Sequence, residues 1–551
     1  MWLKALDMCF EKLKLDGLDF GTVIGVSGCA QQHGSVWWRR ESSQLLAQLS
    51  PDEYLHKALV SAFSLRNSPV WMDSSTSEEC RQMENYVGGA SKLAEITGSR
   101  AYERFTGPQI KRIFKHKREA YMVTERIQLI SNFLASILCG QYAPFDASDA
   151  SGMNLLEVAT KRWSEVCLEA VVDGDAGELA GLRARLGCDE LSPGDNVVDS
   201  HEIVGRVSRY LVERYGFPPE CLVSSFTGDN PASLAGLCVG RDELVVSLGT
   251  SDTAFFALDT PTPGCNGHVL RNPIDERRFM GLVCFKNGSR TRERIRDHCA
   301  AGQWDRFEAL LNSVPRGNFG NIGLYYDLRE IYPLVTGDFR WNAHDQRVES
   351  FSAELEVRAC LESQFLRLLH HSQALGLQMA PIRRLLVTGG ASENKAILQV
   401  AADVFRVPVY TLEMANSACL GAAYLAKYAY ELEQQKLDQS FRLQRLELAD
   451  ESQIMGDGCN IQEKEKTNDE EEEEEEEREQ ERRELAQEKQ VDFVQMVLGS
   501  SDESELRRLV RCAEPTPLAA HTVDAYEALL KRYVRLETEI GLNNDATLLQ
   551  Q

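Results

Sequence analysis

The sequence predicts an α/β protein with more than one hydrophobic core. Between residue 1 and about residue 430, helical periodicity alternates with short apolar runs, the pattern of layered helices and strands. The chain has 551 residues, 43% of them hydrophobic, which is enough for two or more sizeable cores. We therefore expect a multi-domain α/β architecture.

Composition limits the partners and the location that we expect. A formal net charge of −24 disfavours nucleic acid, because Lys and Arg dominate phosphate binding. The 15 cysteines form no CxxC pair, so we expect reduced, mostly buried thiols. The longest mostly apolar helical candidate, residues 127–139, is shorter than the roughly 20 residues that a bilayer helix needs. The chain opens with an amphipathic helix rather than a targeting signal, so we expect a cytoplasmic protein without a membrane partner.

The first expected strand, residues 22–27, leads into a polar segment. Gly28 permits a turn that delivers Gln31, Gln32 and His33 into a pocket. Amide and imidazole groups donate to and accept from several hydroxyls at once, which suits a polyol ligand. Taken alone, the segment is also compatible with an ordinary polar loop.

Two further polar segments are candidates for the wall of this pocket. Trp71, Met72 and Asp73 form the first, and residues 102–107 follow a helix predicted over 91–96. Within the second, Arg104 offers a rigid fork of donors that can fix a sugar or a neighbouring carboxylate. A solvated surface arginine, and a packed aromatic beside a surface acid, are the plainer interpretations.

The segment 224–233 reads S-S-F-T-G-D-N-P-A-S and precedes a helix start rich in Ala and Leu. This pattern places Asp229, between Gly228 and Asn230, at an exposed turn. A carboxylate there can accept a proton from an attacking hydroxyl. An aspartate at a helix N-terminus is also an ordinary cap.

Two turns rich in small residues are candidates for binding phosphates. Strands predicted at 244–248 and 254–258 are joined by residues 249–253, whose free N–H groups and hydroxyls allow close approach to phosphate oxygens. A simple hairpin turn is the alternative there. A later strand, 385–388, ends in residues 389–392 and opens a helix predicted over 393–405, a geometry that can hold a nucleotide. The absence of any Gly-Lys dipeptide excludes a Walker-type loop.

The last part of the chain changes character. Residues 432–505 are polar and charged and include an unbroken glutamate run at 470–477, so we expect a disordered insertion that is helical at most over 478–489. An acidic tether for a basic partner is the functional alternative. Apolar residues between 526 and 540 share one helical face, so we expect residues 506–551 to return as a docked C-terminal helix.

Taken in order, these motifs resemble the FGGY family of carbohydrate kinases, and its xylulose-phosphorylating branch in particular. The matching segments are residues 27–36, 99–107, 227–237, 247–253, 284–289 and 388–394. The resemblance implies a two-domain actin/hexokinase-like (ribonuclease H-like) α/β fold with a central cleft. A sugar-binding domain would occupy residues 1–235 and an ATP-binding domain residues 236–431, followed by the insertion and the docked helix.

The resemblance also implies an activity and its residues. The family's reaction would be ATP-dependent phosphorylation of D-xylulose to D-xylulose 5-phosphate with Mg²⁺, by a phosphotransferase acting on an alcohol group that is a monomer or weak homodimer. Asp229 would be the base on the terminal hydroxyl. The implied sugar contacts are Gln32, His33, Arg104, Asp229 and Asn230. The implied nucleotide contacts are Gly249, Thr250, Ser251, Trp304, Gly389, Gly390, Ala391 and Asn394. No residue is assigned as a metal ligand, since magnesium would bridge the phosphates.

The sequence departs from the family pattern at its start. Family members open with a strand, a phosphate-binding turn and a second strand, and this segment is not found here, so we expect the first domain to be incomplete at its N-terminus. Residues 19–22, Asp-Phe-Gly-Thr, look like a replacement, but they lead directly into the strand before Gln31, where the family has no phosphate turn. A catalytically impaired xylulose-binding or scaffold protein is therefore the alternative function. Glycerol or ribulose as substrate is a third hypothesis, which residues 31–33 and 102–106 fit less well than xylulose.

Overall fold

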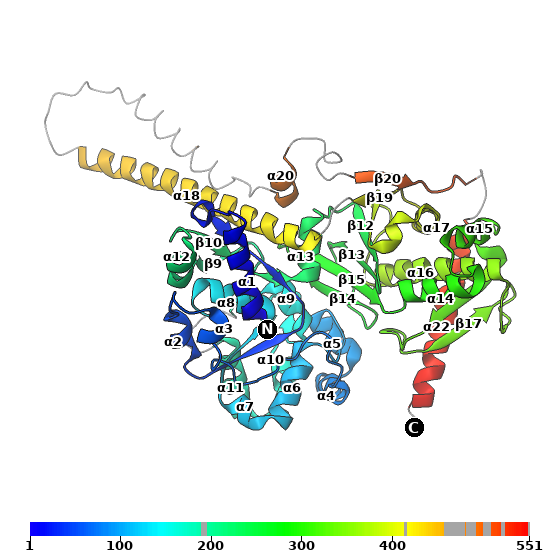
Figure 1. Cartoon of the computed structure of the whole chain (residues 1–551), viewed down its shortest axis with the longest axis horizontal. Helices are drawn as coiled ribbons and strands as arrows, with labels where there is room; N and C mark the ends of the chain where they lie inside the picture. The colour runs from blue at the N-terminus through cyan, green and yellow to red at the C-terminus, as the bar shows by residue number, and fades with distance from the viewer. Residues whose placement is uncertain are drawn as a thin grey trace, which may run out of the picture.

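The computed structural model describes residues 1–188, 196–412, 416–456, 480, 492–499, 509–518 and 524–548. Figure 1 shows two α/β bodies beside each other. We call the part from α1 to α13 the first body and the part from β12 to β19, together with β20, the second body. No helix in the described ranges is both long and apolar enough to cross a membrane.

The first body is built from short helices. Their bounds are α1 (Trp2–Leu15), α2 (Ser42–Ala47), α3 (Leu55–Ala58), α4 (Ser77–Val87), α5 (Ala90–Thr97), α6 (Thr106–His116), α7 (Arg118–Met122), α8 (Ile130–Cys139), α9 (Ala147–Ala150), α10 (Glu165–Val171), α11 (Ala176–Leu186), α12 (Arg209–Tyr215) and α13 (Asp229–Gly236). The predicted helix over 91–96 is confirmed as α5, and the opening amphipathic helix is α1.

The strands of the first body pair in several small sheets. β1 (Gly25–Val26), β10 (Leu222–Ser224) and β9 (Ile203–Arg206) form one, and β2 (Cys29–Ala30) pairs in parallel with β11 (Thr227–Gly228). The others are β3 (Ser35–Arg39) with β4 (Thr124–Leu129), β5 (Phe145–Asp146) with β8 (Val197–Val198), and β6 (Leu156–Glu157) with β7 (Arg162–Trp163). The parallel register of β2 and β11 brings the segments after Ala30 and Gly228 to the same place.

Two predictions for the first body were wrong in detail. The strand expected over 22–27 is reduced to β1, because Phe20–Thr22 forms a 3-10 turn in which Asp19 accepts from the Gly21 N–H at 2.9 Å. The apolar run 127–139, expected to be one helix, begins in β4 and continues in α8. The first residues of that run pair with β3, where Trp37 lies opposite Ile127 and both are buried. Periodicity in a short apolar run does not separate these two states.

The second body is organised around a mixed seven-stranded sheet. Its order is β14 (His268–Arg271), β15 (Phe279–Phe285), β13 (Asp252–Leu258), β12 (Glu243–Leu248), β18 (Arg384–Thr388), β19 (Val409–Leu412) and β20 (Leu509–Ala513). Helices α14 (Ser289–Ala300), α15 (Trp304–Asn312), α16 (Ala353–Ala374) and α17 (Lys395–Phe405) and the hairpin of β16 (Ile322–Tyr326) and β17 (Gly337–Trp341) complete it. The strands predicted at 244–248, 254–258 and 385–388 are confirmed, and the helix predicted over 393–405 begins at Lys395 after the 3-10 turn Gly390–Glu393.

The turns that matter for the site lie together at one end of the strands of this sheet. Ser247 is in register with Thr253 on one side and with Thr388 on the other, and Thr253 is in register with Cys284. The hairpin after β12, the turn after β18 and the loop after β15 therefore all begin at the same end of the sheet's strands.

The C-terminal predictions are partly corrected. α18 (Ser417–Gly456) continues through the first part of the segment expected to be disordered, and α20 (Phe493–Leu498) is helical as well. Phe493 packs edge-on against Tyr428 of α18 at 5.2 Å. This apolar contact holds α20 on α18, although the charged composition of the segment did not predict it. The glutamate run 470–477 and residues 478–489, apart from the helical Gln480, lie outside the described residues.

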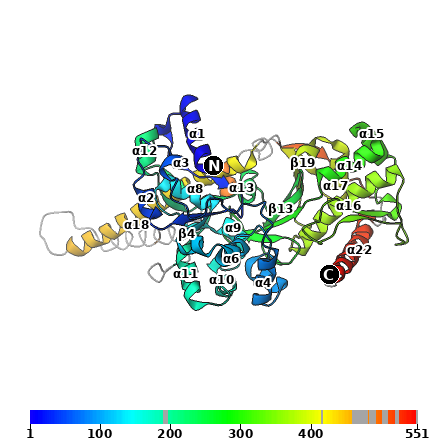
Figure 2. The ribbon, with the colours of Figure 1, turned by 60° about the horizontal axis from the view of Figure 1, so that its bottom comes forward.

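The segment expected to be a docked C-terminal helix, residues 506–551, contains both a strand and a helix, because residues 509–513 form β20 at the edge of the sheet. α22 (Ala525–Leu548) packs on α16 of the second body, with Tyr526, Tyr533 and Leu536 buried. Both α18, which runs from beside α13 along the first body, and α22 can be followed in Figure 2.

Candidate functional site

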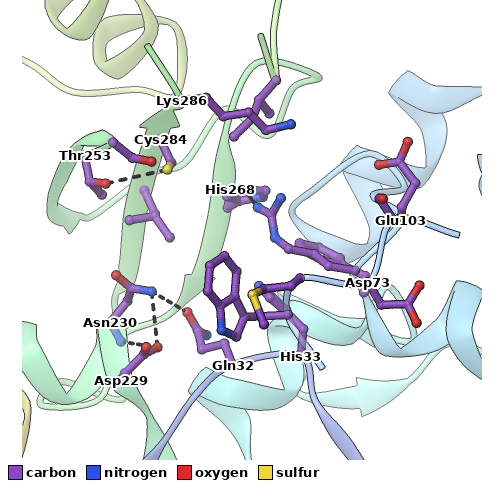
Figure 3. A pocket seen from close by; sticks show the side chains of 18 of the residues that line it. Gln32, His33, Asp73, Glu103, Asp229, Asn230, Thr253, His268, Cys284 and Lys286 are labelled. Carbon is purple, nitrogen blue, oxygen red and sulfur yellow. Dashed lines mark hydrogen bonds between the residues drawn. The ribbon is translucent and has the colours of Figure 1, made fainter. Parts of the chain in front are cut away.

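A cavity of about 580 Å³ lies between the two bodies and contains all the predicted sugar contacts. The first body contributes Gln32, His33, Trp71, Met72, Asp73, Ser74, Glu103, Arg104, Phe105, Asp229 and Asn230, and the second contributes Ser251, Thr253, His268, Leu270, Leu282, Cys284, Lys286 and Ile331. Figure 3 shows Asp229, Asn230 and Gln32 grouped on one side of this cavity. They meet because they follow the paired strands β2 and β11.

His33 is held as a neutral imidazole. Its Nδ1 lies 2.9 Å from the Gly152 carbonyl oxygen, to which it donates, and its ring stacks on Phe105 at 4.3 Å. Burial, and then the nearby Arg104 charge, lower the pKa of His33 to about 3. With Nδ1 protonated, Nε2 is left as an acceptor.

Arg104 spans the two bodies. Its guanidinium donates to Nε2 of His268 at 3.2 Å, and it lies over the rings of Tyr102 and Phe105 at 5.2 and 5.5 Å. Burial holds the pKa of His268 well below its usual value, so the neutral ring donates through Nδ1 to Ser99 Oγ at 3.0 Å and accepts from Arg104 through Nε2. Sequence reasoning missed His268, because nothing in its local sequence marks it.

Asp229 is the first residue of α13 and is accessible from the cavity. Partial burial raises the pKa of the Asp229 carboxyl. The Asn230 N–H donates to this carboxylate at 3.0 Å and opposes the rise. The Asn230 amide also donates to Gln32 Oε1 at 3.0 Å, which fixes both amides.

Asp149, also missed by the sequence analysis, lies behind this group. Gln32 Nε2 approaches its carboxyl at 3.4 Å, and Ser131 donates to it at 2.5 Å. Burial raises the pKa of Asp149 to about 8. A carboxyl that is mostly protonated at neutral pH adds little negative charge beside Asp229.

A second cavity, of about 540 Å³, lies in the second body and collects most of the predicted nucleotide contacts. Its lining includes Gly249, Thr250, Trp304, Gly390, Ala391 and Asn394. Ser251 faces the first cavity instead. Gly389 lines neither cavity, but it has φ +89° and a Cβ there would lie 2.6 Å from the Leu248 carbonyl oxygen, so only glycine lets the two turns meet.

The walls of the second cavity are well supported. Trp304 packs edge-on against Phe307 at 5.3 Å with the Arg296 guanidinium over its ring at 4.8 Å. Asn394 caps α17 by accepting from the Ile397 N–H at 3.0 Å, and Gly390 has open space where a side chain would be. Below the hairpin, buried Asp252 accepts from both terminal nitrogens of buried Arg292 at 2.6 and 3.0 Å.

The remaining candidate residues differ in whether they line a cavity. Trp71, Met72 and Asp73 line the first, whereas residues 19–22 line neither. Among the described residues, the group of three possible metal ligands within 4.8 Å is His370, His371 and Glu537 on α16 and α22, which line neither cavity. His371 there donates to Glu537 at 2.9 Å, as a buried helix-to-helix contact.

Comparisons with known proteins agree with this arrangement. Models of the FGGY family of carbohydrate kinases match residues 62–236 (N-terminal domain) and 244–430 (C-terminal domain). The chain is 49% identical over 426 residues to a xylulose kinase of Rattus norvegicus, covering 77% of each protein. It is 43% identical over 443 residues to xylulose kinase 2 of Arabidopsis thaliana, covering 78% of this chain and 76% of that protein.

Solved structures confirm the predicted fold class. A ligand-bound xylulose kinase from Lactobacillus acidophilus superposes with a TM-score of 0.66 at 16% identity, covering 98% of this chain and 88% of that one. A xylulose kinase from Rhodospirillum rubrum gives 0.64 at 14% identity, covering 94% and 84%. At such identities the likeness shows the two-domain sugar-kinase fold alone, and the family models and sequence relatives decide the assignment. This chain belongs to the FGGY family of carbohydrate kinases.

Proposed function

We propose that this protein catalyses the ATP-dependent phosphorylation of D-xylulose to D-xylulose 5-phosphate. The observation that carries the proposal is the position of the hairpin after β12. Gly249 and Thr250 line the second cavity, while Ser251, the next residue, lines the first cavity together with Asp229. A phosphoryl group held at this hairpin would therefore face both a nucleotide and an acceptor hydroxyl.

The first cavity suits a ketopentose. His33 offers an acceptor, the linked amides of Gln32 and Asn230 offer donors and acceptors, and Arg104 offers donors in a fixed orientation. Groups fixed in this way favour a ligand whose hydroxyls match them all, because an analogue lacking one hydroxyl leaves a polar group unpaired.

Asp229 is the proposed base. The terminal hydroxyl oxygen of the sugar would form the new P–O bond, the bond from the γ-phosphorus to the bridging oxygen would break, ADP would leave, and the hydroxyl proton would pass to Asp229. Positioning supplies much of the rate in such a reaction, and the contacts of Asn230 and Gln32 keep the acceptor side rigid.

The second cavity fits a nucleotide. Trp304 offers an aromatic surface for adenine, and the open space above Gly390 permits close backbone approach by ribose and phosphates. Magnesium, when bound with the nucleotide, would supply positive charge that offsets the charge developing on the phosphates. The residues present fit a metal carried in by the nucleotide, with Asp229 as the nearby cleft carboxylate.

The alternative of a non-catalytic xylulose-binding or scaffold protein has no support in the comparisons, whose relatives carry the kinase name. We further propose that the enzyme works in the cytoplasm as a monomer or weak homodimer, without nucleic-acid or membrane partners. Light scattering of the purified chain across a concentration series checks the oligomeric state, and a trimer or larger assembly would contradict it.

A coupled ADP-release assay tests the proposal. We expect turnover with D-xylulose to exceed that with D-ribulose or glycerol, and to fall by at least about 100-fold in Asp229→Asn. Asp259→Asn is the matched control, because Asp259 is an exposed acid outside both cavities. Equal turnover of all three substrates, or full activity of Asp229→Asn, would contradict the proposal.

A further inference from the structure

The loop after β15, residues 286–288, connects the first cavity with the phosphate-facing hairpin. Lys286 lines the same cavity as Asp229 and Ser251. The next residues touch the hairpin directly, since the Ser289 N–H donates to the Gly249 carbonyl at 3.0 Å and a Cβ on Gly288 would lie 2.8 Å from the Thr250 carbonyl oxygen. Lys286 therefore stands beside the place where acceptor and phosphate meet.

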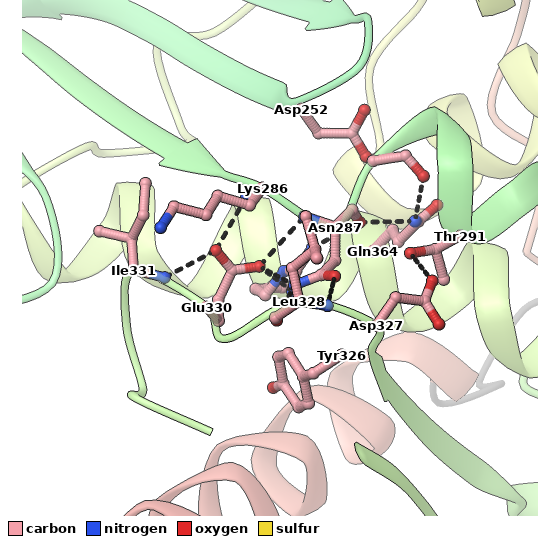
Figure 4. A network of polar contacts seen from close by, with 12 residues as sticks. Asp252, Lys286, Asn287, Thr291, Tyr326, Asp327, Leu328, Glu330, Ile331 and Gln364 are labelled. Atoms are coloured by element: carbon pink, nitrogen blue, oxygen red, sulfur yellow. Dashed lines mark hydrogen bonds and ion pairs between the residues drawn. The ribbon is translucent and has the colours of Figure 1, made fainter. Parts of the chain in front are cut away.

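Buried side chains hold the backbone of this loop (Figure 4). One oxygen of Glu330 accepts from the N–H groups of Lys286 and Ile331, each at 2.8 Å, and the other accepts from the Asn287 side chain at 2.9 Å. Arg367 pairs with the same carboxylate at 3.2 Å and donates to the Asn287 carbonyl at 3.2 Å. Both Glu330 and Arg367 are almost fully buried.

This buried network fixes the backbone of one short loop. The side chain of Lys286 takes no part in it. It is exposed, it extends from the fixed backbone beside the cavity in Figure 3, and within the described part of the chain its ammonium has no hydrogen-bond or ion-pair partner. The other cation of the cavity, Arg104, is already engaged by His268 and two aromatic rings.

We propose that Lys286 is a further catalytic residue, whose ammonium binds oxygens of the phosphoryl group during its transfer, and that Glu330 is its positioning residue. The inference rests on the proposed kinase function. A lysine ammonium is a compact point charge suited to phosphate oxygens, and a cation placed in advance stabilises the charge of the transferring group without reorganisation. Binding of a sugar hydroxyl by Lys286 is the competing role.

The test compares Lys286→Met, which keeps the length of the side chain, with Lys286→Arg, which keeps its charge. We expect Lys286→Met to lower kcat by about 100-fold with little change in the KM for D-xylulose, and Lys286→Arg to recover most of the loss. Lys531→Met, which removes an exposed charge from α22, is the control. An unchanged kcat, or a loss confined to the KM for D-xylulose, would overturn the proposal.

Calorimetry separates this inference from the proposed function, because it needs no turnover. We expect Lys286→Met to weaken binding of D-xylulose 5-phosphate at least about tenfold while binding of D-xylulose is retained. Absence of turnover in the unmodified chain would contradict the kinase proposal, whereas equal binding of the sugar phosphate by the unmodified chain and Lys286→Met would contradict the role of Lys286.

The positioning role has its own test. Glu330→Gln should lower kcat, and combining it with Lys286→Met should add little further loss, since both changes remove one function. Asn287→Ala is a milder variant that keeps the buried ion pair of Glu330 and Arg367 while removing three hydrogen bonds of the Asn287 side-chain amide. It should give a smaller loss with the same lack of additivity. Fully additive losses in both combinations would refute the link between Glu330 and Lys286.

Discussion

Replacing Gly236 by alanine should lower kcat by about 100-fold without unfolding the protein. Helices α13 and α18 cross so closely that a Cβ on Gly236 would lie 1.9 Å from the Ser417 carbonyl oxygen and 2.8 Å from the Gly421 nitrogen. Non-bonded atoms need about 1 Å more than this, so α13 must shift by roughly that distance. Because α13 begins at Asp229, the shift would displace the proposed base.

The assay measures kcat and KM for D-xylulose together with the melting temperature. Overpacking of this kind costs about 1–3 kcal/mol, so the variant should remain folded. Gly421→Ala, whose Cβ would lie 1.8 Å from the Ala232 carbonyl oxygen, should act in the same direction from the opposite helix. Gly177→Ala, within α11 and at an ordinary contact distance of 3.4 Å, is the matched control. An unchanged kcat in Gly236→Ala with a lowered melting temperature would refute the coupling of this crossing to the base.

Three further predictions concern the pH profile, the nucleotide and the hairpin. Asp229 acts as a base only when ionised, and its pKa is raised, so kcat/KM should fall on the acid side with a midpoint above the ordinary 3.8; a midpoint at or below that value would contradict the assignment. Trp304→Ala should raise the KM for ATP about tenfold and leave the KM for D-xylulose unchanged, and equal effects on both would argue against an adenine contact. Asp252→Asn leaves buried Arg292 without its carboxylate, which should cost about 3–5 kcal/mol and lower the melting temperature by about 10 °C, and no change in thermal denaturation would show that the ion pair is not stabilising.

Local sequence patterns predicted those parts of the site in which a functional side chain lies next to the turn that positions it. Gly28 before Gln32 and His33, and Gly228 before Asp229, mark where strands end in polar turns, and the pairing of β2 with β11 brings the two turns together. The hairpin between β12 and β13 was also predictable, because two short apolar runs frame its small residues.

Contacts between distant segments carry no such signal. His268 joins Arg104 across the cavity from β14, and Asp149 lies behind Gln32 from α9, yet neither stands in a marked motif. The helical continuation of α18 to Gly456 was missed because the charged composition of the segment outweighed its helical propensity. The division of residues 127–139 between β4 and α8 depends on pairing with β3, which the run itself does not encode.

Direct detection of D-xylulose 5-phosphate tests the central claim. Mass spectrometry of a mixture of the purified chain, D-xylulose and magnesium ATP should show the sugar phosphate and ADP forming in equal amounts, and Asp229→Asn under the same conditions should form almost none. Failure of the unmodified chain to form the sugar phosphate, or equal formation by Asp229→Asn, would contradict the account of this cleft as a xylulose-phosphorylating site with Asp229 as its base.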